Sequence, residues 1–106
     1  MSQYEFHPEA AIDLDEIWDF IAEDSLDAAD KVIGDILDAV EALVSSPRQG
    51  RRRPDLTGCP LRFAQVRDYL IAYAPDEKPL WVVAVMHGRR SPRVMAAILR
   101  GREGRV

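Results

Sequence analysis

The sequence predicts an α+β fold in which two antiparallel helices pack on a mostly antiparallel sheet, in the order β-α-α-β-β-β with a short C-terminal helix. Three observations support this prediction. The first half of the 106-residue chain carries two long segments with apolar side chains at helical spacing. The second half changes to short extended segments separated by turn residues. Both the helices and the sheet have an apolar side, and burying these sides against each other gives two packed layers.

The length of 106 residues is that of one ordinary domain, so we expect residues 1–106 to form a single unit. The chain is 47% hydrophobic, enough for a core, and Cys59 is its only cysteine, which excludes an intrachain disulfide. No apolar run approaches the roughly 20 residues of a membrane helix, and the first residues lack the pattern of a secretory signal. We therefore expect a cytoplasmic protein without a membrane contact.

The net charge of −4 hides a strong separation of charge. Residues 1–46 contain 13 acidic side chains and one basic side chain, whereas residues 47–106 contain 5 acidic and 13 basic ones. Codon bias is one explanation for the predominance of arginine over lysine, but it does not explain why the charges segregate. The pattern favours a basic half that meets an acidic partner.

The N-terminal segment Gln3–Phe6 alternates weakly and predicts a short strand. A helix follows, since Pro8 suits the first helical position and Glu9 places negative charge in the first turn. The helix is expected to end near Glu23. Its periodic apolar positions are Ala10, Leu14, Ile17, Trp18 and Ile21.

A second helix is predicted between Ser25, which is a good N-cap, and Pro47, which stops it. Because only two or three residues separate the two helices, they must form an antiparallel hairpin. The apolar stripe of the second helix covers about four turns. Its members are Ala29, Val32, Ile33, Ile36, Leu37, Val40, Leu43 and Val44.

Residues 48–60 are rich in Arg, Pro and Gly and are expected to form a connecting loop. Three strands follow, joined by a tight turn at residues 67–68 and by a proline-bounded turn at residues 75–79. The last strand is uninterrupted apolar sequence, which is typical of a strand buried on both faces. The predicted strands are Leu61–Val66, Tyr69–Ala74 and Leu80–Met86.

Ser91 and Pro92 resemble the N-cap and first residue of a short closing helix. Its apolar side is formed by Val94, Met95, Ile98 and Leu99. The tail after this helix, residues 101–106, is expected to be loosely held.

Six short segments carry a resemblance to a known family: Phe6–Ala10, Ile17–Ile21, Ser46–Gly50, Leu61–Phe63, Tyr69–Tyr73 and Val85–Arg90. Together, over about residues 3–99, they resemble the ParE branch of the RelE/ParE superfamily of type II toxin–antitoxin systems. The resemblance implies a toxin without a cofactor, neutralised in a hetero-oligomer by a ParD-like antitoxin with an acidic C-terminal tail. It also implies that the toxin poisons DNA gyrase and that it meets DNA only through the antitoxin.

The related RelE branch cuts mRNA in the ribosome, so an endoribonuclease is the second hypothesis. Metal-free RNA cleavage needs a base, a cation for the phosphate charge and an acid for the leaving oxygen. RelE-like nucleases take an Arg from the middle strand, but this strand reads Tyr69–Tyr73 with no Arg. His87 and Arg67 are the remaining catalytic candidates. A third hypothesis, an inactive relative, predicts no growth arrest.

The candidates for contact with the target are the basic residues around the sheet. A histidine at the end of an apolar strand also has a structural interpretation, as a cap that hydrogen-bonds a turn, and Arg89 and Arg90 could equally form a solvated chain segment. The target-binding candidates are Arg62, Arg67, His87, Arg89 and Arg90.

The candidates for antitoxin contact lie on the helical hairpin and the sheet. Tyr69, Ile71 and Tyr73 share one face of their strand, so one sheet face is expected to meet the helices and the other to leave large side chains for a partner. A tail in that groove would bury apolar side chains, and basic residues at its rim would meet acidic ones. The antitoxin-binding candidates are Trp18, Ile21, Tyr69, Tyr73 and Arg62.

Other site types find no support in the sequence. His7, His87 and Cys59 lack any metal-ligand spacing, so no metal is expected. Cys59 stands between Gly58 and Pro60 without a companion base, and no Gly-rich phosphate loop occurs.

Overall fold

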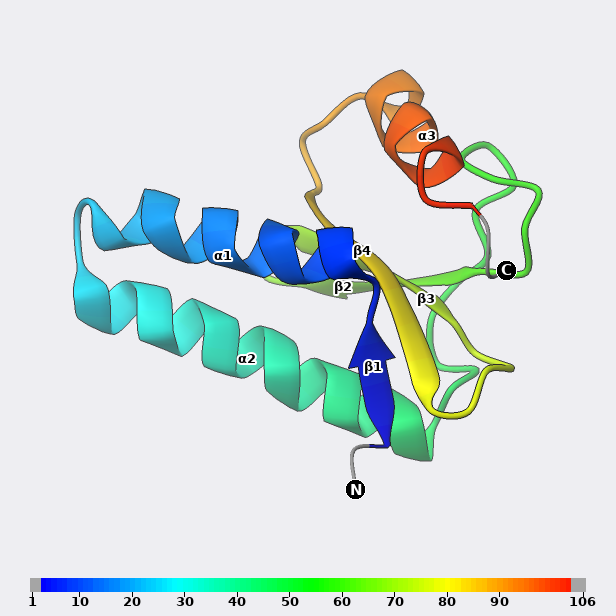
Figure 1. Ribbon diagram of the computed structural model, residues 1–106, viewed down its shortest axis with the longest axis horizontal. Coiled ribbons are helices and arrows are strands. Elements are labelled where there is room, and N and C mark those ends of the chain that lie inside the picture. Colours follow the sequence, from blue (N-terminus) through cyan, green and yellow to red (C-terminus); the bar gives the residue numbers. More distant parts are fainter. Residues whose placement is uncertain (1–2, 104–106) are drawn as a thin grey trace.

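A computed structural model describes residues 3–103 of the chain, and Figure 1 shows its helices and strands. The order of elements is the predicted one. The elements are β1 (Tyr4–Phe6), α1 (Pro8–Ala22), α2 (Leu26–Ser45), β2 (Arg62–Val66), β3 (Tyr69–Ala74), β4 (Leu80–His87) and α3 (Pro92–Arg100).

The four strands form one mixed sheet in the order β1-β4-β3-β2. β2, β3 and β4 are joined by antiparallel pairing, as predicted for hairpin-linked strands. The helical hairpin connects β1 to β2. β1 pairs with β4 in parallel, with Phe6 opposite Val82. The turn between β2 and β3 is tight enough to place Arg67 at a φ of 54°. In the strand order of the sheet, β2 is an edge strand, and this edge forms part of the site described below.

The helical hairpin covers one face of the sheet, as the apolar stripes predict (Figure 1). Each helix begins at a side-chain cap: His7 Nδ1 accepts from Glu9 N at 3.0 Å, and Ser25 Oγ accepts from Ala28 N at 3.1 Å. The core on this side combines both helices with one face of β3 and β4. Its buried members are Ala10, Ile36, Val40, Leu43, Ile71, Tyr73, Leu80, Val82 and Val85.

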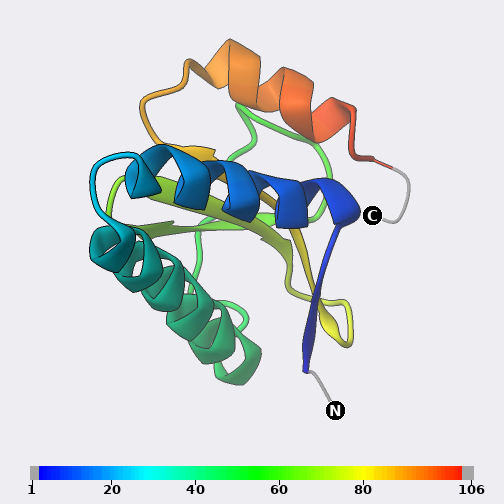
Figure 2. The ribbon, with the colours of Figure 1, turned by 60° about the vertical axis from the view of Figure 1, so that its left-hand side comes forward.

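The opposite face of the sheet is not left open for a partner, and the expectation that it would be was wrong. α3 and the loop of residues 51–60 cover it, and Figure 2 shows α3 set apart from α2 with the sheet and α1 between them. Leu56, in the loop, is buried as part of the apolar cluster on this face. The other buried members are Leu61, Phe63, Ala72, Ala74, Val83, Ala84, Met86, Met95 and Leu99.

The start of the C-terminal tail is also held more firmly than its sequence indicates. The Arg102 side chain, only 10% exposed, donates two hydrogen bonds to the Asp13 carboxylate, at 2.6 and 2.9 Å. Arg102 also donates to Val83 O at 3.0 Å, while Asp13 accepts from Val85 N at 3.0 Å. β1 ends before these two β4 residues, so the ion pair occupies the strand edge that β1 leaves free. Residues 104–106 of the predicted tail lie outside the described part of the chain.

Within residues 3–103, no helix combines the length and the apolar character that crossing a membrane requires.

Candidate functional site

A groove runs along the outer edge of the sheet, between β2 and the C-terminal half of α2. We call it the edge groove; its volume is about 470 Å³. α2 supplies small and apolar walls, the loop after it supplies two arginines, and β2 supplies the floor. The lining residues that matter below are Ala39, Leu43, Arg51, Arg53, Phe63 and Gln65.

Half of the β2 edge is already paired. Arg51 N donates to Phe63 O at 2.9 Å, and Phe63 N donates to Arg51 O at 2.7 Å. In an antiparallel ladder alternate residues direct their backbone groups to the same side, so Gln65 presents its N–H and C=O to this outer edge. No other residue among 3–103 pairs with that edge beyond Phe63. The edge groove therefore offers two unpaired backbone groups above an apolar floor.

A second concave surface, the basic cavity, lies around the corner, where the β2–β3 turn meets the start of α3. It has a volume of about 370 Å³. Three arginines line it and one carboxylate, Asp68, lies beside them. Its lining includes Arg53, Gln65, Asp68, Tyr69, Arg89 and Arg90.

A third, smaller surface is the α1 hollow, of about 240 Å³, between α1 and the end of β4. Phe20 stands at its rim with 72% of its surface exposed, although large apolar side chains are usually buried. Glu16, His87 and Arg90 supply polar and charged groups. The basic cavity shares Arg53 and Gln65 with the edge groove, and Tyr69 and Arg90 with the α1 hollow, so the three surfaces adjoin one another.

His87 caps a turn at the end of β4, which is the structural interpretation of a histidine at the end of an apolar strand. Its Nδ1 accepts a hydrogen bond from Arg89 N at 3.1 Å, and its ring stands edge-on to Tyr69 at a centroid distance of 5.3 Å. Burial, and then the nearby Asp68 carboxylate, raise the pKa of Tyr69, which stays protonated at neutral pH. The pair thus leaves only His87 Nε2 for a catalytic proton transfer.

Arg67, the other catalytic candidate, points away from His87. Its Nε donates to Asp35 Oδ2 of α2 at 2.7 Å. The geometry therefore does not bring His87 and Arg67 together as base and cation, and the cation that lines the α1 hollow with His87 is Arg90. Among the described residues, no group of His, Cys, Asp and Glu side chains could hold a metal ion either.

The structure divides the remaining predicted contact residues into separate places. Tyr69, His87, Arg89 and Arg90 come together at the basic cavity and the α1 hollow. Arg62 is occupied at the other end of β2, donating to Gly50 O at 2.7 Å and so tying down the loop after α2.

Tyr73 is a core residue, not a surface for the antitoxin, because it is fully buried. Its hydroxyl donates to Pro47 O at 2.7 Å and accepts from Gly50 N at 2.9 Å, which fixes the same loop. Trp18 and Ile21 lie partly buried on α1, and Trp18 Nε1 donates to Asp30 of α2 at 2.9 Å. Neither residue lines any of the three surfaces, and the Trp18 hydrogen bond links the two helices.

Sequence reasoning missed Phe20 and Gln65, and it offered contact of Arg53 with target or phosphate only as the lesser alternative to a flexible basic loop. Phe20 carried a usable signal, since it is a large apolar side chain on the polar side of an amphipathic helix. Gln65 carried none, because its importance comes from a backbone edge that only the strand order reveals. Arg53 lies in a loop whose path the sequence does not specify.

The family model described as ParE toxin of type II toxin-antitoxin system, parDE, matches residues 4–92. A solved structure described as the chromosomal ParDE TA system from P. aeruginosa superposes with a TM-score of 0.64 at 23% sequence identity, covering 79% of this chain and 92% of that one. At that identity the superposition bears on the fold. No curated protein sequence matches the chain significantly.

Proposed function

Because the chain belongs to the ParE toxin family of type II toxin–antitoxin systems, we propose that it poisons DNA gyrase by binding, without catalysis, and that a ParD-like antitoxin neutralises it by occupying the edge groove. The observation that carries the proposal is that the edge groove, the basic cavity and the α1 hollow adjoin one another. Together they give an extended segment of another protein a path around the free end of the sheet.

The edge groove fits the tail of an antitoxin in two respects. A strand laid beside β2 would pair with the Gln65 backbone, and its apolar side chains would rest on Leu43 and Phe63. Arg51 and Arg53 line the groove and no acidic side chain does, so an acidic tail would gain favourable electrostatics and faster encounter.

The basic cavity is the proposed surface for the target. Arg89 and Arg90 are exposed, and neither forms an ion pair with a residue in the described part of the chain. Of the predicted target contacts, Arg62 and Arg67 have internal partners, which leaves Arg89 and Arg90 as the main ones.

The antitoxin contact is tested by changing one backbone group. Gln65→Pro removes the outward N–H of the edge strand and leaves the pairing with β3 intact, whereas Gln65→Thr changes the side chain and keeps the N–H. Calorimetry with the antitoxin encoded beside this chain should show at least a tenfold weaker Kd for Gln65→Pro and little change for Gln65→Thr. Equal affinities in both variants would contradict strand addition at this edge.

The target is tested with purified gyrase and supercoiled plasmid. Gyrase poisoning predicts toxin-dependent double-strand cleavage that the antitoxin suppresses and that Arg89→Ala with Arg90→Ala reduces. The endoribonuclease alternative predicts discrete mRNA cuts on induction, mapped by primer extension, that His87→Ala abolishes. Cuts of that kind, without DNA cleavage, would overturn the proposal.

A further inference from the structure

The outer side of α1 carries an exposed apolar stripe that leads into the α1 hollow. Phe20 stands at the rim with 72% of its surface exposed, and Ile12, which is 52% exposed, lies two turns earlier on the same side of the helix. Ile17 and Val85 add apolar lining to the hollow itself. An exposed apolar patch of this kind, beside a hollow and rimmed by charges, marks a surface that meets another protein.

Two charged side chains of opposite sign in the hollow lack a partner. The other polar groups are occupied, since the Asp13 carboxylate binds Arg102 and His87 Nδ1 accepts a backbone N–H. Glu16 on the α1 wall and Arg90 on the opposite wall are both exposed, and neither forms an ion pair within residues 3–103. The hollow thus offers one free acid and one free base on facing walls.

This mixture of charges restricts the occupant. A segment of a single sign, such as an acidic tail, would be attracted by Arg90 and repelled by Glu16. The surface that fits has to bring a base to Glu16 and an acid to Arg90. A second copy of the same surface does so, because in a two-fold symmetric contact residue i meets residue j and residue j meets residue i.

The separation of charge along the chain supports the same occupant. Residues 1–46 carry 13 acidic side chains and one basic one, whereas residues 47–106 carry 5 acidic and 13 basic ones. The α1 hollow lies on the boundary between these halves, with one wall from α1 and the other from β3, β4 and the loop after β4. α1 itself lies between α2 and α3 (Figure 2). A two-fold axis at this boundary therefore places the acidic half of each copy opposite the basic half of the other.

We infer that the free chain forms a two-fold symmetric dimer through the α1 hollow. Phe20 of each copy enters the hollow of the other, and Glu16 of each copy pairs with Arg90 of the other. An apolar cavity of about 150 Å³ holds a benzene ring, so the hollow, at about 240 Å³, has room for the phenyl ring. The dimer covers Arg90, one of the proposed target contacts, so the free toxin has to dissociate before it engages its target. Only this last consequence rests on the proposed function.

The test is sedimentation velocity on the full chain freed from antitoxin. Loading concentrations from about 5 to about 500 μM bracket the affinity of a small interface. The mass should rise with concentration from the 12.0 kDa of the monomer toward twice that value. Phe20→Ser removes the ring at the centre of the contact and should raise the dimer Kd by at least about tenfold.

Charge reversal tests the two-fold pairing itself. Glu16→Arg places an arginine opposite Arg90 at both symmetry-related contacts, and Arg90→Glu likewise places a carboxylate opposite Glu16. Each variant alone should raise the dimer Kd by at least about 30-fold. In an equimolar mixture of the two variants, a heterodimer regains both opposite-charge contacts, so its Kd should return to within about threefold of the original. Asp15→Arg is the matched control, because Asp15 is exposed on α1 but does not line the hollow, and it should dimerise like the original chain.

A chain that stays monomeric at every concentration would overturn the inference, as would single reversals that fail to associate when they are mixed. If the chain alone is monomeric and Glu16→Arg instead weakens binding of the antitoxin, the hollow belongs to the antitoxin and the inference is wrong. Circular dichroism checks that each variant is folded. The sedimentation experiment contains neither gyrase nor antitoxin, so a failed dimer leaves the proposed function standing, and a failure to poison gyrase leaves the dimer standing.

Discussion

Replacing Arg102 with Met should cost a large part of the stability of the domain. The substitution keeps the length of the side chain but removes the guanidinium that binds Asp13, Glu9 and Val83 O. The Asp13 side chain, 15% exposed, would keep only the hydrogen bond from Val85 N. Breaking a buried ion pair by removing one partner costs about 3–5 kcal/mol, and the remaining donor and partial exposure reduce this to about 2–4 kcal/mol.

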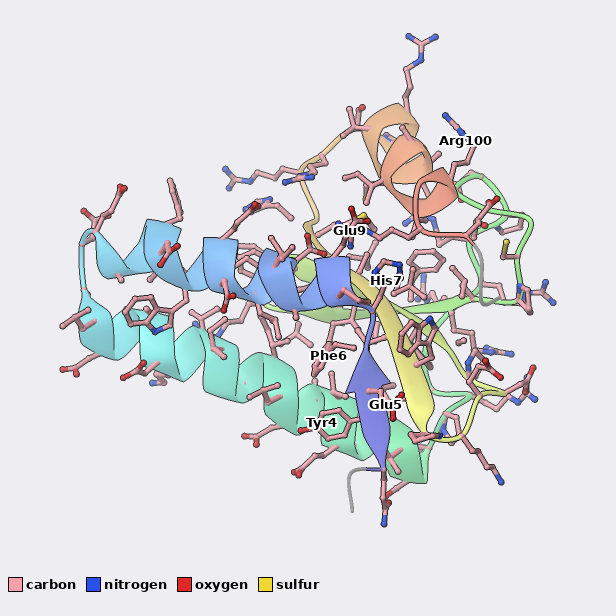
Figure 3. The ribbon with its side chains drawn as sticks, in the orientation of Figure 1. Tyr4, Glu5, Phe6, His7, Glu9 and Arg100 are labelled. Carbon is pink, nitrogen blue, oxygen red and sulfur yellow. The ribbon has the colours of Figure 1, made fainter. Side chains whose placement is uncertain are left out.

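A domain of this size is stable by only about 5–15 kcal/mol, so the loss should lower Tm by more than about 8 °C. Urea titrations followed by circular dichroism measure the change in the free energy of unfolding. Figure 3 shows Glu9 at the start of α1, on the side that faces α3. Arg100→Met, in the same segment but exposed, serves as the control and should stay within about 0.5 kcal/mol.

The double variant Asp13→Leu/Arg102→Met separates the energy of the Asp13–Arg102 interaction from that of the other contacts of the two side chains. It removes both charges and leaves the strand edge of Val83 and Val85 without side-chain partners. Since no unpaired buried charge remains, the double variant should be no less stable than Arg102→Met alone. The coupling energy is then at least as large as the cost of Asp13→Leu alone. A cost below about 1 kcal/mol for Arg102→Met, or strict additivity in the double variant, would refute the role of this pair.

The remaining predictions concern the loop after α2 and the exposed face of α1. Gly50→Ala should destabilise the fold by about 1–3 kcal/mol in urea titrations, because an added Cβ would lie 2.5 Å from the Tyr73 hydroxyl and 2.9 Å from Phe63 O; an unchanged midpoint would count against this packing. Tyr73→Phe should cost about 1–3 kcal/mol at neutral pH by leaving Pro47 O and Gly50 N–H without their partner. Burial raises the pKa of Tyr73, so the folded state holds the tyrosine proton more tightly than the unfolded state does. The free energy of unfolding should therefore fall as the pH rises above about 10. This alkaline loss of stability should be smaller in Tyr73→Phe. Phe20→Ser should leave the free energy of unfolding within about 0.5 kcal/mol, since the ring is 72% exposed, while lowering the tendency of the free chain to aggregate in light scattering.

The helices and strands were predictable from sequence because each is determined locally. Ser25 and Ser91 cap their helices as expected, and the alternation of Tyr69–Ala74 places its side chains on the two faces as found. The parallel pairing of β1 was not predictable, because Gln3–Phe6 gives no signal for its partner. Long-range pairing depends on the whole fold, not on the strand itself.

The burial of the second face of the sheet was not predictable from local sequence patterns. Leu56 is a single apolar residue in a loop of Arg, Pro and Gly, and nothing nearby marks it as a core residue. Arg102 likewise has the sequence context of a solvated tail, yet a carboxylate 89 positions earlier in the chain holds it. Both depend on contacts distant in sequence, and the prediction of an open sheet face failed for that reason.

The sharing of residues between the three surfaces bears on how neutralisation works. An antitoxin tail that continues from the edge groove past Arg53 and Gln65 into the basic cavity would place its acidic side chains beside Arg89 and Arg90, the proposed target contacts. Inhibition would then follow from occupancy alone, with no change in the toxin's conformation. An antitoxin held only on the hairpin near Trp18 would leave Arg89 and Arg90 open, and neutralisation would then require a movement of the sheet. The core on both faces of β4 opposes such a movement, because every residue from Leu80 to Met86 is buried. Direct occupancy is therefore the mechanism that this architecture favours.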